Sequence, residues 1–460
     1  MLTACYLLLR RYKSLNQRIW RMSWPPMVSN ITTPLLGLVD TAVVGHLADA
    51  SHLGAVAIGA TVFSFVFWAF GFLRMGSTGL TAQAWGRNDL ERVRELLYQS
   101  VLMALVLGLL LIVLRQPIID LALYFIDPSD EVAPFARLYC EIRIFSAPAV
   151  LSTYALIGWF YGVQQARNPL WIMLMINIAN MLLDVIAVYG LHMTSDGVAL
   201  ATVLADYLGF TLALYLAYRK MHGLTAKKSI KMGRFDVKKL TSLTRYMALV
   251  QVNRHLFVRT ILLLSVSLFF TAQGAQQSDA ILAANAVLLI FLMIISNALD
   301  GFAFAVEALC GECIGKQDRS AFQQTVWFST FWALIAACLL VITFWLSGET
   351  IIHLLTSIES VQQEAMIYLP WLILLPLLGI WSFMLDGIFI GATATKQMQY
   401  STLFAVLGVF FPCWYLSQQL GLGNHGLWLS QALLFVARAI SLYWLYRRNM
   451  STNLWFTNTQ

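Results

Sequence analysis

The segment PLLGLVDTAVVGH, residues 34–46, places the carboxylate of Asp40 inside the first long apolar run of the chain. A second carboxylate, Asp184, ends the segment NIANMLLD, residues 177–184, in the fifth such run. Neither run contains a Lys or Arg. A charged side chain at bilayer depth is costly unless it faces a polar cavity or a partner. We therefore expect these two acids to mark an ion or substrate pathway through a membrane.

The composition also indicates a membrane protein. Hydrophobic residues make up 59% of the chain and charged residues 12%, and the mean hydropathy is +0.71. Soluble domains carry roughly 25% charged residues. The net charge of +7 comes from basic residues clustered between apolar runs, as membrane topology demands, so we expect no nucleic-acid partner.

Apolar runs of about 20 residues, long enough to span a bilayer, predict twelve transmembrane helices. They fall at 22–46, 53–80, 94–114, 137–162, 168–190, 197–218, 246–270, 280–307, 322–346, 366–388, 398–419 and 426–446. Basic loops alternate with neutral or acidic ones, which predicts a multi-pass protein of the inner (plasma) membrane with both termini in the cytoplasm.

The two halves of the chain are related by a sequence repeat. A shift of 229 residues superimposes five pairs of glycines where chance predicts about one: Gly45 and Gly274, Gly86 and Gly315, Gly158 and Gly387, Gly162 and Gly391, Gly197 and Gly426. A shift across six helices keeps their direction, so the halves are a parallel repeat about a pseudo-two-fold axis. The predicted fold is an all-α membrane protein with a cytoplasmic N-terminal extension (1–21), a six-helix lobe (22–218), a cytoplasmic linker (219–245), a second six-helix lobe (246–447) and a cytoplasmic tail (448–460).

Four polar residues of the first lobe are the main candidates for a coupling site. Counted from the helix ends at 1.5 Å per residue, Asp40, Asp184 and Thr202 lie at one depth, roughly 9 Å inside the outer boundary. Asn180 lies one helical turn before Asp184, on the same face. Such oxygen ligands could hold either a shared proton or a Na⁺ ion, and no other cofactor or metal is expected. The alternative is that these groups only fix helix packing, a role that Asn and Thr often have in membranes.

Other polar residues are secondary candidates. Asn177 extends the same face, and Asp206 lies one turn after Thr202. Asp300 and Asp386 lie toward the inner ends of their spans, where we expect the side chains to reach the cytoplasmic surface cheaply. Cys310 and Cys313 form one CxxC pair with no second pair, so packing at a helix end is expected there.

Prolines indicate where the first span could bend. Pro25 and Pro26 can start a helix, because proline is tolerated in a first turn. Pro34 removes a backbone hydrogen bond inside the span and predicts a kink or hinge.

The segments at 34–47 and 79–86 (GLTAQAWG), together with Asn180, Asp184 and Thr202, resemble the multidrug and toxic compound extrusion (MATE) family, in particular its DinF-like branch. The resemblance covers nearly the whole chain after about residue 20. It implies cation-coupled export of organic, often cationic, compounds, with the coupling site at residues matching Asp40, Asn180, Asp184 and Thr202.

The sequence thus predicts a secondary active antiporter, exporting small organic molecules in exchange for H⁺ or Na⁺, and acting as a monomer surrounded by membrane lipid. The alternative is a flippase for a lipid-linked saccharide, which would favour a strongly basic cavity, whereas basic residues are nearly absent from the central spans. A membrane enzyme would need a nucleophile, metal or cofactor constellation, and no catalytic spacing indicates one.

Overall fold

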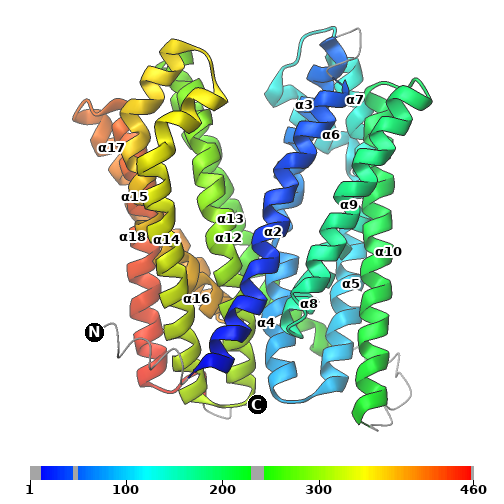
Figure 1. Ribbon diagram of the computed structural model, residues 1–460, viewed down its shortest axis with the longest axis vertical. Coiled ribbons are helices and arrows are strands. Elements are labelled where there is room, and N and C mark those ends of the chain that lie inside the picture. Colours follow the sequence, from blue (N-terminus) through cyan, green and yellow to red (C-terminus); the bar gives the residue numbers. More distant parts are fainter. Residues whose placement is uncertain (1–11, 45–49, 229–242, 457–460) are drawn as a thin grey trace. The chain divides into compact units, whose positions relative to one another are not determined.

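The structure, a computed structural model, describes residues 12–44, 50–228 and 243–456; within them, the side chains of 31–44, 50, 225–228 and 243–245 are not described. In this part of the chain every regular element is a helix and none is a strand. Figure 1 shows the helices as long, mostly antiparallel rods within each half. The predicted all-α membrane class is confirmed.

The N-terminal half holds α2 (Lys13–Val44), α3 (Ala50–Ala69), α4 (Phe72–Gly86), α5 (Leu90–Val113), α6 (Arg115–Ile126), α7 (Ala133–Arg143), α8 (Ala147–Gly162), α9 (Arg167–Val185) and α10 (Ser195–Lys228). The C-terminal half holds α12 (Leu243–Gln277), α13 (Asp279–Gly315), α14 (Arg319–Leu355), α15 (Glu359–Gly391), α16 (Thr395–Leu403), α17 (Phe411–Gln419) and α18 (Gly423–Ser451).

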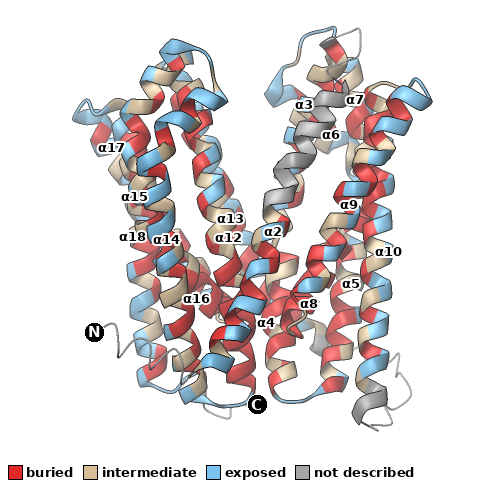
Figure 2. Cartoon of the chain, in the orientation of Figure 1, coloured by how far each residue is buried: buried red, intermediate tan, exposed pale blue. Residues whose placement is uncertain are grey.

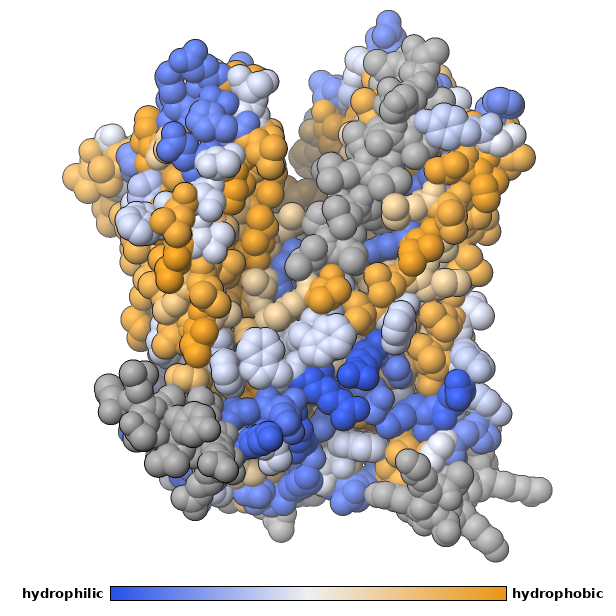
Figure 3. All heavy atoms as spheres, viewed as in Figure 1, coloured by the Kyte–Doolittle hydropathy of each residue, from blue (hydrophilic) through white to orange (hydrophobic). Residues whose placement is uncertain are grey.

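Eleven helical stretches among the described residues are long and apolar enough to cross a bilayer. The predicted first span belongs to α2, where part of the side chains is not described. Predicted span four is α7 and α8 joined by a short 3₁₀ turn, and span eleven is α16 and α17 joined by a π-helical segment, Phe404–Phe410. In each half, apolar side chains cover the middle of the helices (Figure 3), as contact with lipid tails requires.

The chain forms two compact units, one of residues 28–250 and one of residues 1–27 together with 251–460. Helix α2 is therefore divided, because its residues through Met27 pack with the C-terminal half. Trp20 makes edge-on contacts with Phe302 and Trp332, and Trp332 Nε1 donates to Asn16 Oδ1 at 2.9 Å. The sequence places the start of the first lobe at residue 22, six residues before the unit boundary; the lobe limits themselves stay predictions.

Helix α2 corrects the interpretation of Pro25 and Pro26. The helix begins at Lys13 and continues through both prolines, which are buried, so neither of them starts it. Each proline lacks the N–H that would bond the carbonyl four residues earlier, which weakens the helix at this point. The weakened turn lies directly before the boundary between the units. The side chain of Pro34 lies outside the described residues, so its predicted kink is not tested.

The glycine repeat marks equivalent helix crossings in the two halves. A Cβ atom added to Gly158 of α8 would lie 2.2 Å from the backbone oxygen of Arg74 in α4. A Cβ atom added to Gly387 of α15 would lie 2.5 Å from the backbone oxygen of Ala303 in α13. Arg74 and Ala303 are themselves related by the 229-residue shift. The repeat therefore preserves close helix packing of the small-xxx-small kind. Most of α4 and α8 is buried, as the colouring of these helices in Figure 2 shows.

Candidate functional site

The candidate site of the N-terminal half lies on one face of α9. Asn177, Asn180 and Asp184 follow one another at helical spacing and are all buried, with relative exposures of 5%, 0% and 0%. Their spacing of three and four residues aligns the side chains on one side of the helix. The neighbouring helix α10 adds the buried hydroxyl of Thr202. The structure thus brings four of the sequence candidates onto two adjacent helices.

Hydrogen bonds fix the geometry between these helices. Asn180 Nδ2 donates to Thr202 Oγ1 at 3.0 Å, and Thr202 Oγ1 donates to the backbone oxygen of Val198 at 2.8 Å. The hydroxyl therefore accepts from the amide and donates to its own helix. This chain of two bonds sets the orientation of the amide beside the carboxyl group of Asp184, one turn further along α9.

The backbone changes its hydrogen-bonding pattern directly after this carboxylate. Helix α9 ends at Val185 and continues as a π-helical turn, Ile186–Gly190, in which Leu191 N donates to Ile186 O at 2.9 Å. Single π turns within helices occur frequently at functional sites, because the wider turn shifts side chains and frees backbone groups. Asp184 therefore lies directly before the point at which the side chains of this helix shift in register.

Asp40, the remaining member of the predicted site, lies in α2, but its side chain is outside the described residues. The structure neither joins it to nor separates it from Asp184. The proposed proton or Na⁺ ligation by these four residues accordingly stays a prediction. Among the residues that the structure describes, no three His, Cys, Asp or Glu side chains gather as metal ligands.

Asp206, a secondary candidate on α10, has a different environment. Arg143 Nη1 at the end of α7 donates to Asp206 Oδ2 at 2.8 Å, and both residues are largely buried. The guanidinium carbon of Arg143 lies 5.7 and 5.3 Å from the ring centres of Phe63 and Phe67. Buried arginine is commonly stabilised by such a carboxylate and by aromatic faces together. Asp206 therefore serves a fixed ion pair that joins α3, α7 and α10.

The C-terminal half contains a buried charge cluster that the sequence did not predict. Arg259 of α12 and Arg438 of α18 both donate from Nη2 to Oδ2 of Asp386 in α15. Their relative exposures are 6%, 5% and 8%. We call this the arginine–aspartate triad. It corrects one expectation, because Asp386 does not reach the surface. Its two arginines are among the few basic residues of the central spans.

A sequence signal for the triad existed. Both arginines lie within the apolar runs 246–270 and 426–446, where a charge requires a partner. The partner lies on a third helix, which sequence spacing cannot reveal. The other secondary candidate of this half, Asp300, is half-buried in α13. Cys310 and Cys313 are buried in the same helix, with Cys313 Sγ 3.8 Å from Thr325 Oγ1.

Comparison with known proteins gives consistent results. The family model MatE matches residues 25–186 and 256–416, once in each half. DNA damage-inducible protein F of Escherichia coli K12 is 41% identical over 448 residues, which cover 97% of this chain and 95% of that protein. Probable multidrug resistance protein NorM of Acinetobacter baylyi is 26% identical over 446 residues, 94% and 96% of the two chains.

Among solved structures, a crystal structure of MATE in the bent conformation matches with a TM-score of 0.86 at 19% identity. The match covers 96% of this chain and 97% of that one. At this identity the likeness shows the fold alone, and it agrees with the parallel repeat of two helical halves.

Proposed function

Because the chain belongs to the MATE family of multidrug and toxic compound efflux transporters, we propose that it exports small organic, often cationic, compounds in exchange for an inward-moving cation. The carboxylates of Asp40 and Asp184 carry this exchange. The observation that supports the proposal most directly is the complete burial of Asp184 in a membrane-spanning helix, on a face with two amides, one of which bonds to the hydroxyl of Thr202.

Burial gives the carboxyl group two states of very different stability. The neutral form tolerates a low-dielectric site, whereas the ionised form needs a proton, a bound cation or water nearby. Protonation from the outer side therefore changes the charge of the site, and release of the proton to the inner side restores it. If the site binds the organic cation better when it is ionised, the same change drives release of the substrate.

The amide and hydroxyl groups provide the oxygen donors that Na⁺ would use. Asn180 and Thr202 are already oriented by their mutual hydrogen bond of 3.0 Å, so little ordering is required when an ion binds. These ligands are hard oxygen donors, which suit a proton relay or an alkali cation better than a transition metal. The same geometry thus serves H⁺ or Na⁺, and the choice between them is an experimental question.

The flippase alternative requires a basic cavity for a lipid-linked phosphate. The two buried arginines of the triad provide positive charge in the C-terminal half, but both are bonded to Asp386. Export of organic compounds is therefore the function that we favour.

The proposal is tested by flux measurements in liposomes. Purified protein is reconstituted, and uptake of ethidium against its gradient is followed by fluorescence under an imposed proton gradient and, separately, an imposed Na⁺ gradient. Asp184→Asn and Asp40→Asn should each abolish gradient-driven transport, because the amide has the shape of the neutral acid but cannot change its charge. Ethidium should bind more weakly to both variants than to the unmodified protein, because each variant resembles the neutral form that releases the substrate.

Asp196→Asn is the matched control. This acid lies in the first turn of α10 and accepts hydrogen bonds from Thr194. It is therefore not part of the polar face of α9. It should transport like the unmodified protein. Gradient-driven transport that survives in the Asp40→Asn, Asp184→Asn double variant would overturn the mechanism, and gradient-driven movement of a lipid-linked saccharide without ethidium transport would favour the flippase.

Cytoplasmic termini are part of the same proposal, since they set the direction of export. The basic linker contains Lys231, which lies outside the described residues. A Lys231→Cys variant should not react with a membrane-impermeant maleimide in intact cells, and should react after the cells are opened. Reaction of the variant in intact cells would contradict the predicted orientation.

A further inference from the structure

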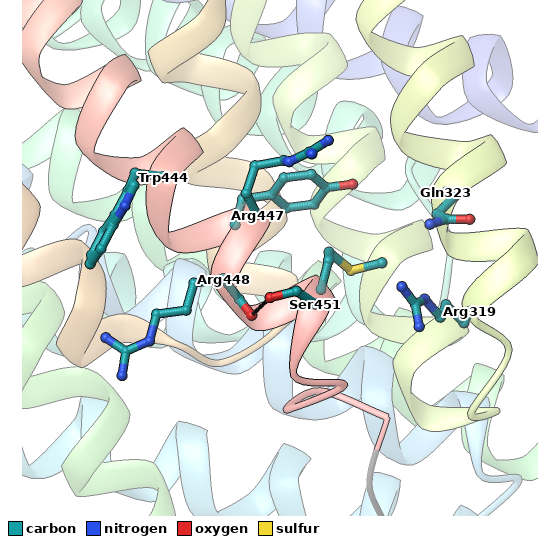
Figure 4. A pocket seen from close by; sticks show the side chains of 8 residues that line it. Arg319, Gln323, Trp444, Arg447, Arg448 and Ser451 are labelled. Carbon is teal, nitrogen blue, oxygen red and sulfur yellow. Dashed lines mark hydrogen bonds between the residues drawn. The ribbon is translucent and has the colours of Figure 1, made fainter.

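A basic pocket lies between the beginning of α14 and the end of α18, within the C-terminal unit and on different residues from the arginine–aspartate triad. Its volume is about 580 Å³, and its lining includes Arg319, Arg447 and Arg448. Figure 4 shows Arg319 and Gln323 of α14 opposite Arg447 and Ser451 of α18, while Arg448 extends along the other side of α18. We refer to this as the basic pocket.

The charge of the basic pocket is positive and is not balanced by its own lining. Its eight lining residues include three arginines and no Asp or Glu. The nearest acid in the sequence, Asp318, caps α14 by accepting from the backbone N–H of Ala321 at 2.9 Å. Arg319 is the first residue of α14, so the positive end of the helix dipole adds to the guanidinium charge. An anionic group is therefore the ligand that this pocket favours.

The back wall of the basic pocket is rigid and aromatic. The ring of Tyr446 stacks on Phe322 with their centres 6.4 Å apart, and it lies 6.1 Å from the ring of Trp455. Phe322 is completely buried, which fixes this wall. Arg319 donates to Asn453, and the guanidinium carbon of Arg448 lies 5.8 Å from the centre of the Trp444 ring. Arg319 and Arg448 are thus each held by a neighbouring side chain, and all three arginines remain exposed.

The position of the basic pocket identifies the source of the anion. Helix α14 begins and α18 ends at this level, where two membrane-spanning stretches leave their apolar segments. Exposed Trp and Tyr side chains at such helix ends lie among lipid headgroups. Arginine forks match the geometry of phosphate oxygens, and basic pockets between membrane helices bind anionic headgroups.

We propose that the basic pocket binds the phosphate headgroup of an anionic phospholipid, such as phosphatidylglycerol or cardiolipin. Arg319 and Arg447 hold the phosphate between α14 and α18, Gln323 donates to the same headgroup, and the acyl chains follow the apolar surface of α14. A phosphatidylcholine headgroup fits less well, because its ammonium group would meet the guanidiniums of Arg319 and Arg447 and no carboxylate among the lining residues.

The test is native mass spectrometry of the full-length protein in detergent, titrated with dioleoyl phosphatidylglycerol or with dioleoyl phosphatidylcholine. The unmodified protein should retain phosphatidylglycerol at lower lipid concentration. An Arg319→Gln, Arg447→Gln, Arg448→Gln variant should need at least tenfold more of it, and its residual binding should be similar for both lipids. Since all three side chains are exposed, the variant should remain folded, which its thermal unfolding checks.

Arg219→Gln is the matched control, because Arg219 is also an exposed arginine near an aromatic ring, 5.8 Å from the centre of Tyr215, but does not line the basic pocket. It should bind phosphatidylglycerol as the unmodified protein does. A triple lysine variant of the three pocket arginines, which keeps the charge, should retain most of the preference. Equal retention of the two lipids by the unmodified protein, or equal losses in the triple glutamine and control variants, would contradict the proposal.

Discussion

The two halves of the molecule share their helix crossings but differ in the polar groups that they bury. Gly158 and Gly387 make equivalent close contacts with backbone oxygens. By the same 229-residue shift, Asp184 of the N-terminal half corresponds to Cys413, and Asp386 of the C-terminal half corresponds to Ile157. These two buried acids therefore lie at positions that are not related by the repeat.

The environments of these two acids suit different tasks. Asp184 lies on a helix face with two amides, where we propose that a change of its charge is coupled to transport. Asp386 is bonded to two buried guanidiniums, so its carboxylate is part of a fixed structural cluster. Close backbone packing therefore constrains the same positions in both halves, whereas the buried polar groups differ between the halves.

The largest effect that this comparison predicts is on stability, from Asp386→Ala. Loss of this acid leaves Arg259 and Arg438 buried without their shared partner, and breaking a buried ion pair in this way costs about 3–5 kcal/mol. Thermal unfolding of the purified protein should shift strongly downward. Asp120→Ala is the control, since its 2.7 Å pair with Arg137 is exposed and such pairs contribute about 0–1 kcal/mol. Equal decreases in the unfolding temperature of Asp386→Ala and Asp120→Ala would show that the buried cluster contributes no more to stability than an exposed ion pair.

An intermediate effect is expected from Gly158→Ala and Gly387→Ala. In each variant the new methyl group meets a backbone oxygen at 2.2 or 2.5 Å, so the crossing helices must separate, at a cost of about 1–3 kcal/mol. Gly223→Ala, with nothing within 4 Å of the added Cβ, should be neutral or slightly stabilising. If only one of the two alanine variants lowers the unfolding temperature, the two crossings are not equally constrained.

The smallest stability effect should come from Thr202→Val. The substitution removes the acceptor for Asn180, and hydrogen bonds between membrane helices contribute about 0.6 kcal/mol on average. Ethidium flux in liposomes should decrease less than in Asp184→Asn, because a ligand is lost and the titrating group remains. Thr202→Ser should restore the flux. A complete loss of transport in Thr202→Val, with folding intact, would contradict this prediction and show that transport requires the hydroxyl as much as the carboxylate.

The sequence predicted the parts of this structure that depend on local pattern. Apolar run lengths identified the spans, and glycine spacing identified the repeat, because close helix contacts tolerate little else at Gly158 and Gly387. The face of α9 followed from helical periodicity alone. The pairing of Asp386 with Arg259 and Arg438 did not, since three helices separated by 52 and 127 residues meet there. The start of α2 was also missed, because Lys13–Arg21 is too polar to be counted in an apolar run.

The division of α2 has a consequence for how the protein is made. Arg18 bonds to Glu312, 294 residues later, and Asn16 bonds to Trp332, 316 residues later. The ribosome therefore completes the whole of the N-terminal unit, and much of the other, before the first helix can find these partners. Until then the first turns of α2 lack these partners. Assembly of the C-terminal unit thus joins the segment that was synthesised first to helices that are synthesised much later.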